Sequence, residues 1–269
     1  MAEKTKNENS ITELVKTLVY ALLLAGIIRT FFFQPFWIPS GSMKDTLLVG
    51  DFLFVNKMSY GYSWASCPTI RGVNLCGFLE GREGRILGGE PERGDVIVFK
   101  HPTTKADFIK RLIGLPGDRI QMKNGVLQIN GEPVKIEAAG TFEELYEEQG
   151  PLGGRPSCEG EGPNADNICV KSKFIETLPN GVAHSILNIR NQRSDNTGVF
   201  TVPEGQYFFM GDNRDNSADS RISIDFGGVG FVDAANIVGR ADRVMFSSAG
   251  RSILAFWTWR SDRYFKAIK

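Results

Sequence analysis

The pattern of hydrophobic and polar positions divides the chain into an apolar N-terminal segment and a longer region with the short period of β-strands. Leu14 to Phe33 is mostly apolar, and about 20 such residues suffice to cross a bilayer as a helix. Lys16 and Arg29 lie near its ends, where long side chains reach the interface. Aromatic residues between 31 and 37 fit the belt found at membrane surfaces. The pattern therefore predicts one transmembrane helix over residues 14–33.

A cleavable signal peptide is the alternative for this segment. Its apolar part would be shorter and would be followed by small residues at the cut, whereas bulky aromatics follow here. Lysines at 4, 6 and 16 favour an N-terminus that stays inside the cell. We therefore expect a cytoplasmic tail over residues 1–13, the membrane helix over 14–33, and an extracytoplasmic β domain over 34–269.

After Pro39 the pattern turns to short strands. They are predicted at Asp51–Lys57, Gly94–Lys100, Phe200–Val202, Tyr207–Met210 and Gly239–Phe246. Residues 119–130 alternate about Asn124-Gly125, the strongest short hairpin signal, and Asn-Gly at 130 and 131 extends the hairpin into a meander. No long amphipathic helix separates these strands. The expected fold class is mostly β: an antiparallel, barrel-like domain with insertions, preceded by one N-terminal transmembrane helix.

Two insertions, at about residues 60–92 and 138–198, interrupt the strands. Both are polar and rich in glycine, so we expect surface excursions with little to bury. Near the C-terminus, residues 253–259 form an apolar patch with two tryptophans, too short to span a bilayer. This patch is either core or a surface that dips into lipid.

The four cysteines form two local pairs, Cys67/Cys76 and Cys158/Cys169, one in each insertion. Neither pair has the two-residue spacing of a zinc knuckle. Each would close a short loop, and we expect two disulfides on the outer side of a membrane. Four free thiols in a cytosolic protein are the alternative.

Charge and histidine content narrow the classes of function. The 269 residues include 31 basic and 31 acidic ones, and this balance argues against a nucleic-acid binder, which shows a clustered basic excess. His101 and His184 are the only histidines, and neither has a setting that suggests a catalytic base. We interpret both as structural or surface residues.

Three polar segments carry the chemistry. They are P-S-G-S-M at residues 39–43, F-I-K-R-L-I-G-L-P-G-D at 108–118, and G-D-N-R-D-N-S-A-D-S-R at 211–221. Ser42 is the candidate nucleophile, and a serine needs a base to take its proton. Lys110 would share a strand face with apolar neighbours, where desolvation lowers the pKa of a lysine towards neutrality. The pair predicts a serine–lysine hydrolase.

Further residues complete this site. In an extended segment Ser40 shares a face with Ser42, so its hydroxyl and the N–H of Ser42 would stabilise an oxyanion. Ser217 is the candidate that holds the neutral Lys110 amine in line. The charged residues expected to pair within the third segment are Asp212, Arg214, Asp215, Asp219 and Arg221. A calcium loop is the alternative, but two arginines oppose a cation and the EF-hand spacing is missing.

The chain resembles the bacterial type I signal peptidases, also called leader peptidases. The matching segments, in the family's order, are residues 39–52, 93–99, 108–118, 211–221 and the part from 228 onward. The roles that the resemblance implies are nucleophile for Ser42, general base for Lys110, oxyanion hole for Ser40, orientation of the base for Ser217, and support of the site for Asp219 and Arg221. Asp45 replaces a proline usual in the family, which implies a changed local turn.

The resemblance also implies a membrane-bound serine endopeptidase that cleaves signal peptides from secretory preproteins without metal or cofactor. The residues expected to line shallow pockets for small substrate residues, first and third before the cut, are Ile38, Pro39, Met43 and Ile109. We expect a monomer in the bacterial inner membrane, in contact with the bilayer, with its N-terminus cytoplasmic and its β domain periplasmic.

Two other functions stay open. One is a self-cleaving serine–lysine regulator of the repressor type, although an apolar segment stands where such a protein has its DNA-binding domain. The other is a non-enzymatic, membrane-anchored β module, which would need no combination of Ser42, Lys110 and Ser217.

Overall fold

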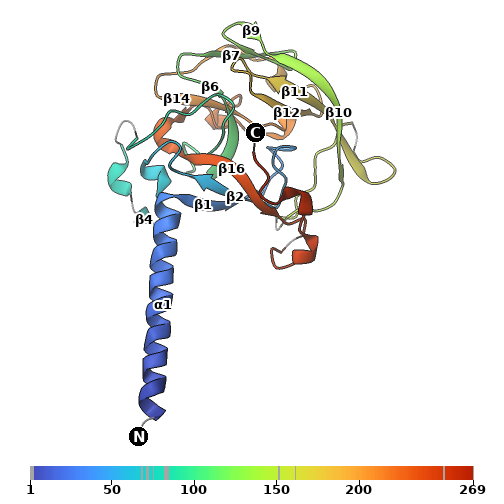
Figure 1. Cartoon of the computed structure of the whole chain (residues 1–269). Coiled ribbons are helices and arrows are strands. Elements are labelled where there is room, and N and C mark those ends of the chain that lie inside the picture. Colours follow the sequence, from blue (N-terminus) through green and yellow to red (C-terminus); the bar gives the residue numbers. More distant parts are fainter. Residues whose placement is uncertain are drawn as a thin grey trace.

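The computed structural model describes residues 3–67, 69–70, 73–74, 76–81, 85–150, 152–160, 162–250 and 252–268. A long N-terminal helix projects from a β-rich body (Figure 1). The helix and strands are α1 (Glu3–Phe31), β1 (Phe33–Trp37), β2 (Asp51–Asn56), β3 (Thr69–Ile70), β4 (Val73–Asn74), β5 (Val96–Lys100), β6 (Asp107–Gly114), β7 (Arg119–Lys123), β8 (Val126–Ile129), β9 (Glu132–Pro133), β10 (Lys135–Leu145), β11 (Ile168–Thr177), β12 (Ala183–Asn188), β13 (Phe200–Thr201), β14 (Gln206–Met210), β15 (Val232–Asp233) and β16 (Ile237–Ser247). Short 3-10 helices occupy Trp64–Ser66, Gly77–Leu79, Arg193–Asp195, Arg214–Asn216, Ile224–Phe226, Ala234–Asn236, Phe256–Thr258 and Ser261–Arg263.

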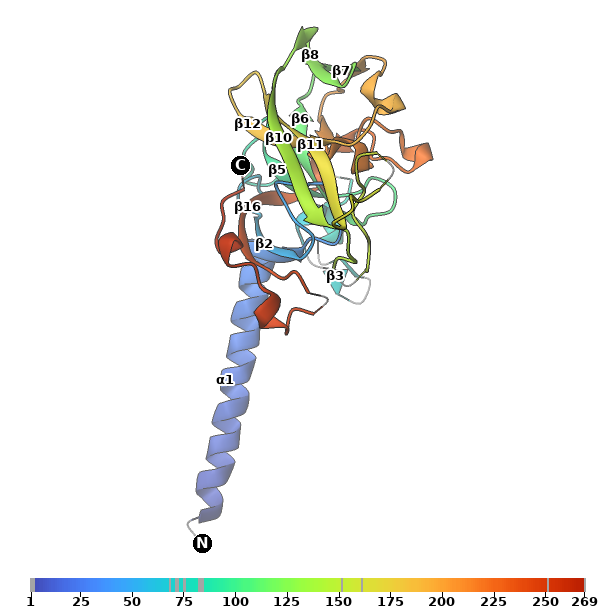
Figure 2. The ribbon, with the colours of Figure 1, turned by 90° about the vertical axis from the view of Figure 1, so that its right-hand side faces the viewer.

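Helix α1 contains a candidate membrane span, Ser10–Phe31. The span has 22 residues, and its most apolar window of 18 residues has a mean hydropathy of 1.9 and is not buried against the body. Two views at right angles show the helix standing clear of the body (Figure 2). A helix of this length extends about 33 Å, close to the hydrocarbon thickness of a bilayer. The span begins somewhat earlier than the predicted segment and ends near the same aromatic residues.

The body is built on a seven-stranded sheet with the order β1-β2-β16-β5-β6-β14-β15. A four-stranded sheet has the order β13-β7-β8-β9, a three-stranded sheet the order β10-β11-β12, and β3 pairs with β4. The ladders between these described strands are antiparallel. The predicted mostly β, antiparallel fold is confirmed, including strands at the five predicted positions and the meander at the two Asn-Gly turns.

Strand β5 is buried on both faces and separates two hydrophobic clusters. Val96 and Val98 join the cluster that contains Ile38, Met43, Leu47, Leu53 and Val244. Ile97 and Phe99 join a second cluster on the opposite face, with Tyr60, Leu112, Phe209 and Val232. A strand covered on both sides needs apolar residues at every position, which explains the uninterrupted V-I-V-F run of the sequence.

The segment over residues 138–198 is not a surface excursion with little to bury. It supplies most of the sheet β10–β12, in which Lys171 is 0% exposed and Glu176 is 1% exposed. Glu144 and Arg214 pair with these two charges. A buried charge is tolerated when an opposite charge meets it, so a polar composition does not by itself mean exposure.

The segment over residues 60–92 also adds to the core. Tyr60 is 1% exposed and Trp64 is 8% exposed. Both predicted disulfides are formed: the Cα atoms of Cys67 and Cys76 lie 5.6 Å apart, and those of Cys158 and Cys169 lie 4.9 Å apart. The second bridge ties the loop before β11 to the strand itself.

Candidate active site

Ser42 lies in a turn between β1 and β2, residues 40–46, called the serine turn below. The buried residue Ile38 anchors the entry, where its N–H donates to the carbonyl of Asp51 (2.8 Å). The backbone bends at Ser40 and then turns, so the expectation of an extended segment that puts Ser40 and Ser42 on one face does not apply. Ser40 is exposed, whereas Ser42 is 8% exposed.

Strand β6 brings Lys110 to this turn. The Nζ atom of Lys110 lies 2.7 Å from Oγ of Ser42 and 2.9 Å from the carbonyl oxygen of Ile109. Lys110 is 4% exposed, and its Nζ lies 5.5 Å from the centre of the Phe108 ring. Ser42 and Lys110, 68 positions apart in sequence, therefore lie in hydrogen-bond contact in a buried site.

The surroundings of Lys110 lower the pKa of its amine to about 8. Burial is the main cause, because the charged form loses its hydration. The carboxylates of Asp219 and Asp212 act in the opposite direction but do not cancel the loss. With this pKa, about one tenth of the amine is neutral at pH 7 and about half at pH 8, and the neutral form is the one that accepts a proton.

The loop over residues 211–221 holds the serine turn in place. Asn213 donates its N–H to the carbonyl of Ser42 (3.0 Å) and its side-chain amide to the carbonyl of Gly41 (2.9 Å). A Cβ atom at Gly211 would lie 2.2 Å from Oγ of Ser217 and 2.6 Å from the carbonyl oxygen of Ser42. Only a glycine at this position lets the loop approach the turn so closely.

Ser217 is buried at 8% exposure, beside Gly211. Its hydroxyl approaches Asp219, yet no described residue completes a hydrogen bond of normal geometry with it. The structure thus brings Ser217 to the site but does not join it to Lys110 by a hydrogen bond.

Asp219 and Arg221 form a bidentate ion pair inside the loop, with both N–O distances 2.9 Å. Asp219 also accepts the N–H of Gly211 (3.0 Å). Burial alone would raise the pKa of Asp219, but Arg221 and the Gly211 hydrogen bond hold that pKa below its ordinary value. This pair fixes the loop beside Lys110, as the sequence predicted for these two residues.

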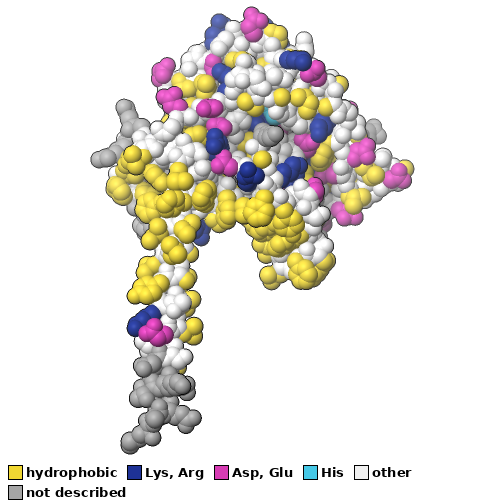
Figure 3. All heavy atoms as spheres, viewed as in Figure 1, with side chains coloured by type: hydrophobic (Ala, Val, Ile, Leu, Met, Phe, Trp, Pro, Cys, Tyr) yellow, Lys and Arg dark blue, Asp and Glu magenta, His cyan; other side chains and the backbone are white. Residues whose placement is uncertain are grey.

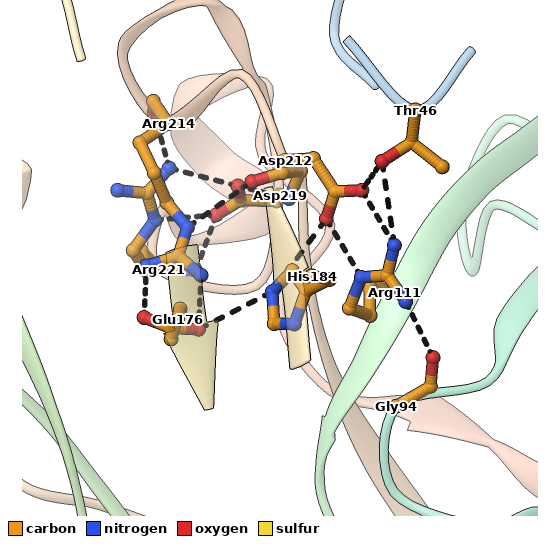
Figure 4. A network of polar contacts seen from close by, with 10 residues as sticks. Thr46, Gly94, Arg111, Glu176, His184, Asp212, Arg214, Asp219 and Arg221 are labelled. Atoms are coloured by element: carbon orange, nitrogen blue, oxygen red, sulfur yellow. Dashed lines mark hydrogen bonds and ion pairs between the residues drawn. The ribbon is translucent and has the colours of Figure 1, made fainter. Parts of the chain in front are cut away.

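Asp212 and Arg214 pair with residues outside the loop (Figure 4), and Asp215 also binds outside it. Asp212 accepts Nε and Nη2 of Arg111 from β6 at 2.8 and 2.7 Å, and the hydroxyl of Thr46 at 2.5 Å. Asp215 accepts the backbone N–H groups of residues 189 and 190. The expectation that these acids pair within the loop is therefore wrong for Asp212 and Asp215.

Arg214 reaches β11, where Glu176 accepts its two terminal nitrogens at 2.9 and 2.6 Å. Nε2 of His184 on β12 lies 3.3 Å from Glu176 and 3.9 Å from Asp212 (Figure 4). Burial lowers the pKa of His184. The ring therefore favours its neutral form and acts as a structural residue between two carboxylates.

His101 is structural as well. Its Nδ1 accepts the N–H groups of Thr103 and Thr104 (both 3.2 Å), and its Nε2 lies 3.1 Å from the carbonyl of Gly228. His101 follows β5 directly and lies at the start of a turn. Neither histidine contacts Ser42 among the hydrogen bonds of the described residues.

Sequence reasoning missed Arg111, Glu176 and the partner role of Thr46. Arg111 follows Lys110 directly, and strand alternation puts the two on opposite faces, so a role for the arginine was open to inference. Glu176 and His184 lie in the segment over residues 138–198, whose polar composition predicts exposure. Nothing in the sequence of that segment points to the site. Among the described residues, no three His, Cys, Asp or Glu side chains gather in a way that could hold a metal ion.

The residues expected to line substrate pockets divide into two groups. Ile38 and Met43 are buried, and Ile109 packs against their cluster. Pro39 is exposed at the entry to the serine turn. Asp45, at the position of the family's proline, accepts a hydrogen bond from Lys173 of β11 (2.5 Å).

The apolar patch near the C-terminus lies on the surface. The exposed fractions are 81% for Leu254, 71% for Phe256 and 75% for Trp257. Trp259 instead stacks on Phe246, with ring centres 4.5 Å apart. In the space-filling view, apolar side chains gather on the side of the body from which α1 projects (Figure 3). The core alternative is therefore wrong for the three exposed residues.

Comparison with known proteins agrees with this geometry. Residues 11–246 match the sequence profile of the family described as signal peptidase, peptidase S26. The chain is 38% identical over 254 residues to a signal peptidase I of Rickettsia typhi, covering 91% of this chain and 84% of the relative. It is 37% identical over 253 residues to that of Rickettsia canadensis, covering 91% and 83%.

Among solved structures, a signal peptidase I from Enterococcus faecalis shares 27% identity with a TM-score of 0.30, covering 56% of this chain and 97% of that one. The family profile extends from the apolar helix to β16 and so takes in Ser42, Lys110 and the whole loop over residues 211–221. The chain belongs to the signal peptidase family, peptidase S26.

Proposed function

We propose that this serine endopeptidase cleaves the signal peptides of secretory preproteins with Ser42 as nucleophile and Lys110 as general base. The observation that supports this proposal most directly is the 2.7 Å contact between Oγ of Ser42 and the buried amine of Lys110. The lowered pKa of that amine, about 8, gives it the proton affinity of a working base near neutral pH. The names of the relatives support the substrate class.

In the first step Lys110 takes the hydroxyl proton of Ser42 while Oγ attacks the carbonyl carbon of the scissile peptide bond. The N–H of Ser42 would stabilise the resulting oxyanion, and the hydroxyl of Ser40 is the second donor that we propose for it. When the intermediate collapses, the C–N bond breaks and the ammonium of Lys110 returns its proton to the leaving amine. The signal peptide then remains as an ester on Ser42.

In the second step the same amine takes a proton from water, and the hydroxide attacks the ester. The protonated Lys110 then returns the proton to Oγ of Ser42 as the signal peptide leaves. Ser217 would orient the neutral amine, because it lies across Gly211 from the serine turn. Asp219 and Arg221 hold the loop that carries Ser217.

Substrate selection follows from the apolar wall beside the serine. Met43 and Ile38 are packed within the core, and Ile109 packs against them. Small side chains at the first and third positions before the cut would fit against this wall and Pro39. The peptide would add as a strand and gain its register from backbone hydrogen bonds.

The apolar helix suggests where the reaction takes place. We propose a single-pass, monomeric protein of the bacterial inner membrane, with its N-terminus cytoplasmic and its body on the periplasmic side. The two disulfides support an oxidising compartment for the body. The exposed Leu254, Phe256 and Trp257 would contact the bilayer on the side from which α1 projects.

Neither alternative function gains support. A self-cleaving regulator would replace the apolar helix with a DNA-binding domain, and a non-enzymatic module would not need a lysine amine buried against a serine hydroxyl. Membership of the peptidase family favours the enzyme over both.

The test is processing of a preprotein in detergent by wild type, Ser42→Ala and Lys110→Ala. Each substitution should abolish cleavage with the fold intact, because the two residues form one proton-transfer unit. Lys123→Ala, in the meander β7–β9, is the matched control and should process normally. Near-normal turnover by a folded Lys110→Ala protein would disprove the assignment of the base.

A further inference from the structure

The serine turn is held from a second side by the sheet β10–β12. Lys44 and Asp45, which follow Met43 in the turn, both contact this sheet. The sheet belongs largely to the insertion over residues 138–198, which supplies neither the nucleophile nor the base proposed above.

Lys44 is 2% exposed, and its ammonium group is enclosed by polar partners from the sheet and the following loop. It pairs with Glu144 of β10 and donates to the side-chain carbonyl of Gln149 (2.7 Å). Gln149 donates its amide N–H to Glu144 (2.7 Å), and the other oxygen of Glu144 pairs with the buried Lys171 of β11. One carboxylate thus binds two buried ammonium groups.

The charges in this cluster are strongly coupled. Burial lowers the pKa of Lys44, and the charge of Glu144 opposes that shift. Burial would raise the pKa of Glu144, but Lys44 and Lys171 outweigh it and lower that pKa. An ion pair at such depth costs desolvation energy and favours a single geometry in which every partner is satisfied.

The aliphatic part of Lys44 lies directly against the backbone of Gly41. A Cβ atom at Gly41 would lie 3.2 Å from Cε, 3.3 Å from Cδ and 3.5 Å from Nζ of Lys44. The next peptide group carries the N–H of Ser42, a candidate donor to the oxyanion. A shift of the Lys44 side chain would therefore move the Gly41–Ser42 peptide.

We propose that Lys44, fixed by Glu144 and Lys171, is a positioning residue that sets the Gly41–Ser42 peptide relative to Lys110. The inference rests on the proposed function for the role of Ser42. It gives the sheet β10–β12 a part in the reaction as the rigid support of the serine turn. The Asp45–Lys173 pair adds a weaker tie, because its side chains are 17% and 27% exposed.

The test compares kcat and KM of full-length Lys44→Met, Glu144→Gln and the double variant on a preprotein in detergent. Lys44→Met keeps the side-chain length without the charge that holds it. We expect kcat to fall about 10- to 100-fold, since a displacement of about 1 Å is worth that much, with KM changed less than about twofold. The double variant should be no slower than Lys44→Met, because the two residues act as one unit.

Two controls separate positioning from folding. Lys135→Met removes an exposed charge from the same strand β10 and should leave kcat and KM unchanged. Lys44→Arg keeps the charge, but its planar head does not fit the same site. We therefore expect kcat per folded molecule to fall, with the folded fraction measured by urea unfolding. The pH midpoint of kcat should stay at its wild-type value in every variant, since none removes a group that contacts Lys110.

The outcomes are distinguishable. Wild-type kcat per folded molecule in both Lys44 variants, whatever their stability, would overturn the positioning role alone. A shifted pH midpoint would also overturn it, because it would show that Lys44 acts on the charge of Lys110. Processing by a folded Ser42→Ala protein would instead reject the proposed function itself.

Discussion

At the scale of single residues, the chemistry depends on how completely burial removes the amine of Lys110 from water. Asp219 and Asp212 favour a charged Lys110, but burial outweighs them and sets the pKa at about 8. Arg221 and Arg111 bind these two carboxylates. Their positive charges offset much of the attraction that the carboxylates would exert on a charged amine. The ion pairs therefore keep acids close to the base without restoring its charge.

The first prediction concerns pH. Lys110 is mostly protonated and inactive below its pKa and neutral above it, so kcat/KM should rise with pH through a midpoint near 8 and level off about one pH unit higher. Lys110→Arg, whose guanidinium stays charged, should be inactive between about pH 6 and 10. A profile centred near 6.5, the usual value of histidine, would argue against the lysine.

The second prediction concerns Gly211. A methyl group there would meet Ser217 Oγ at 2.2 Å and the carbonyl of Ser42 at 2.6 Å, so Gly211→Ala must displace the loop or the serine turn. We expect kcat to fall at least about 100-fold, on the scale of a 1 Å misplacement. Gly198→Ala, where nothing lies within 4 Å, is the control and should keep wild-type kcat. Equal rates for the two variants would contradict this account of the loop.

At the scale of elements, buried ion pairs join the sheet β10–β12 to the rest of the body. Glu176 of β11 binds Arg214. Burial would raise the pKa of Glu176, but Arg214 and His184 outweigh that effect and lower the pKa to about 2. Removing one partner leaves the other charge buried without a counter-charge, which lowers the free energy of unfolding. Exposed pairs on the same sheet have no such consequence.

The third prediction compares two glutamates of this sheet. Glu176→Gln should lower the free energy of unfolding by about 3–5 kcal/mol, because Arg214 is left buried without its counter-charge. Glu137→Gln on β10 breaks a pair whose side chains are 66% and 57% exposed, and it should cost less than about 1 kcal/mol. Urea unfolding followed by tryptophan fluorescence measures both. A similar loss in the two variants would mean that burial does not decide the stability of these pairs.

The sequence was sufficient for elements whose local signals agree with their environment. Asn124-Gly125 marks the β7–β8 hairpin through its turn preference, and the V-I-V-F run marks β5 through burial on both faces. Ser42 and Lys110 were found because a serine and a lysine with those neighbours fit a known catalytic pattern. Their contact at 2.7 Å required the fold.

The sequence was insufficient where long-range pairing decides the outcome. Lys171 and Glu176 look like solvent-facing charges, and only their partners from distant segments make burial possible. The two arginines nearest in sequence predict that Asp212 pairs within its own loop. Its ion-pair partner in the structure is instead Arg111 of β6. Such choices depend on which strands become neighbours, and a single sequence does not state that.

At the scale of the whole molecule, apolar surface is concentrated where α1 meets the body and in the nearby C-terminal segment (Figure 3). Phe31, Phe32 and Phe33 are 49%, 40% and 38% exposed at the end of the helix. Trp257, at 75% exposed, is the largest side chain of the C-terminal group. Large exposed apolar patches of this kind mark sites of contact with a membrane or a protein.

The fourth prediction tests lipid contact at this patch. Full-length protein in vesicles of brominated phospholipid should show quenched tryptophan fluorescence, and Trp257→Phe should remove part of the quenched component. Trp64→Phe removes a tryptophan that is only 8% exposed and should leave that component unchanged. Identical quenching in wild type and Trp257→Phe would place the C-terminal patch outside the lipid.

The junction between α1 and the body is short and is held by hydrogen bonds to the last residues of the helix. Lys57 donates its N–H to the carbonyl of Phe32 (3.0 Å), and the hydroxyl of Tyr62 donates to the carbonyl of Phe31 (2.5 Å), before β1 begins at Phe33. These hydrogen bonds attach the end of the helix to the body directly before β1, the strand that leads to the serine turn. With α1 in the bilayer as proposed above, this short connection holds Ser42 at one height over the membrane surface, and each substrate must bring its own scissile bond to that height.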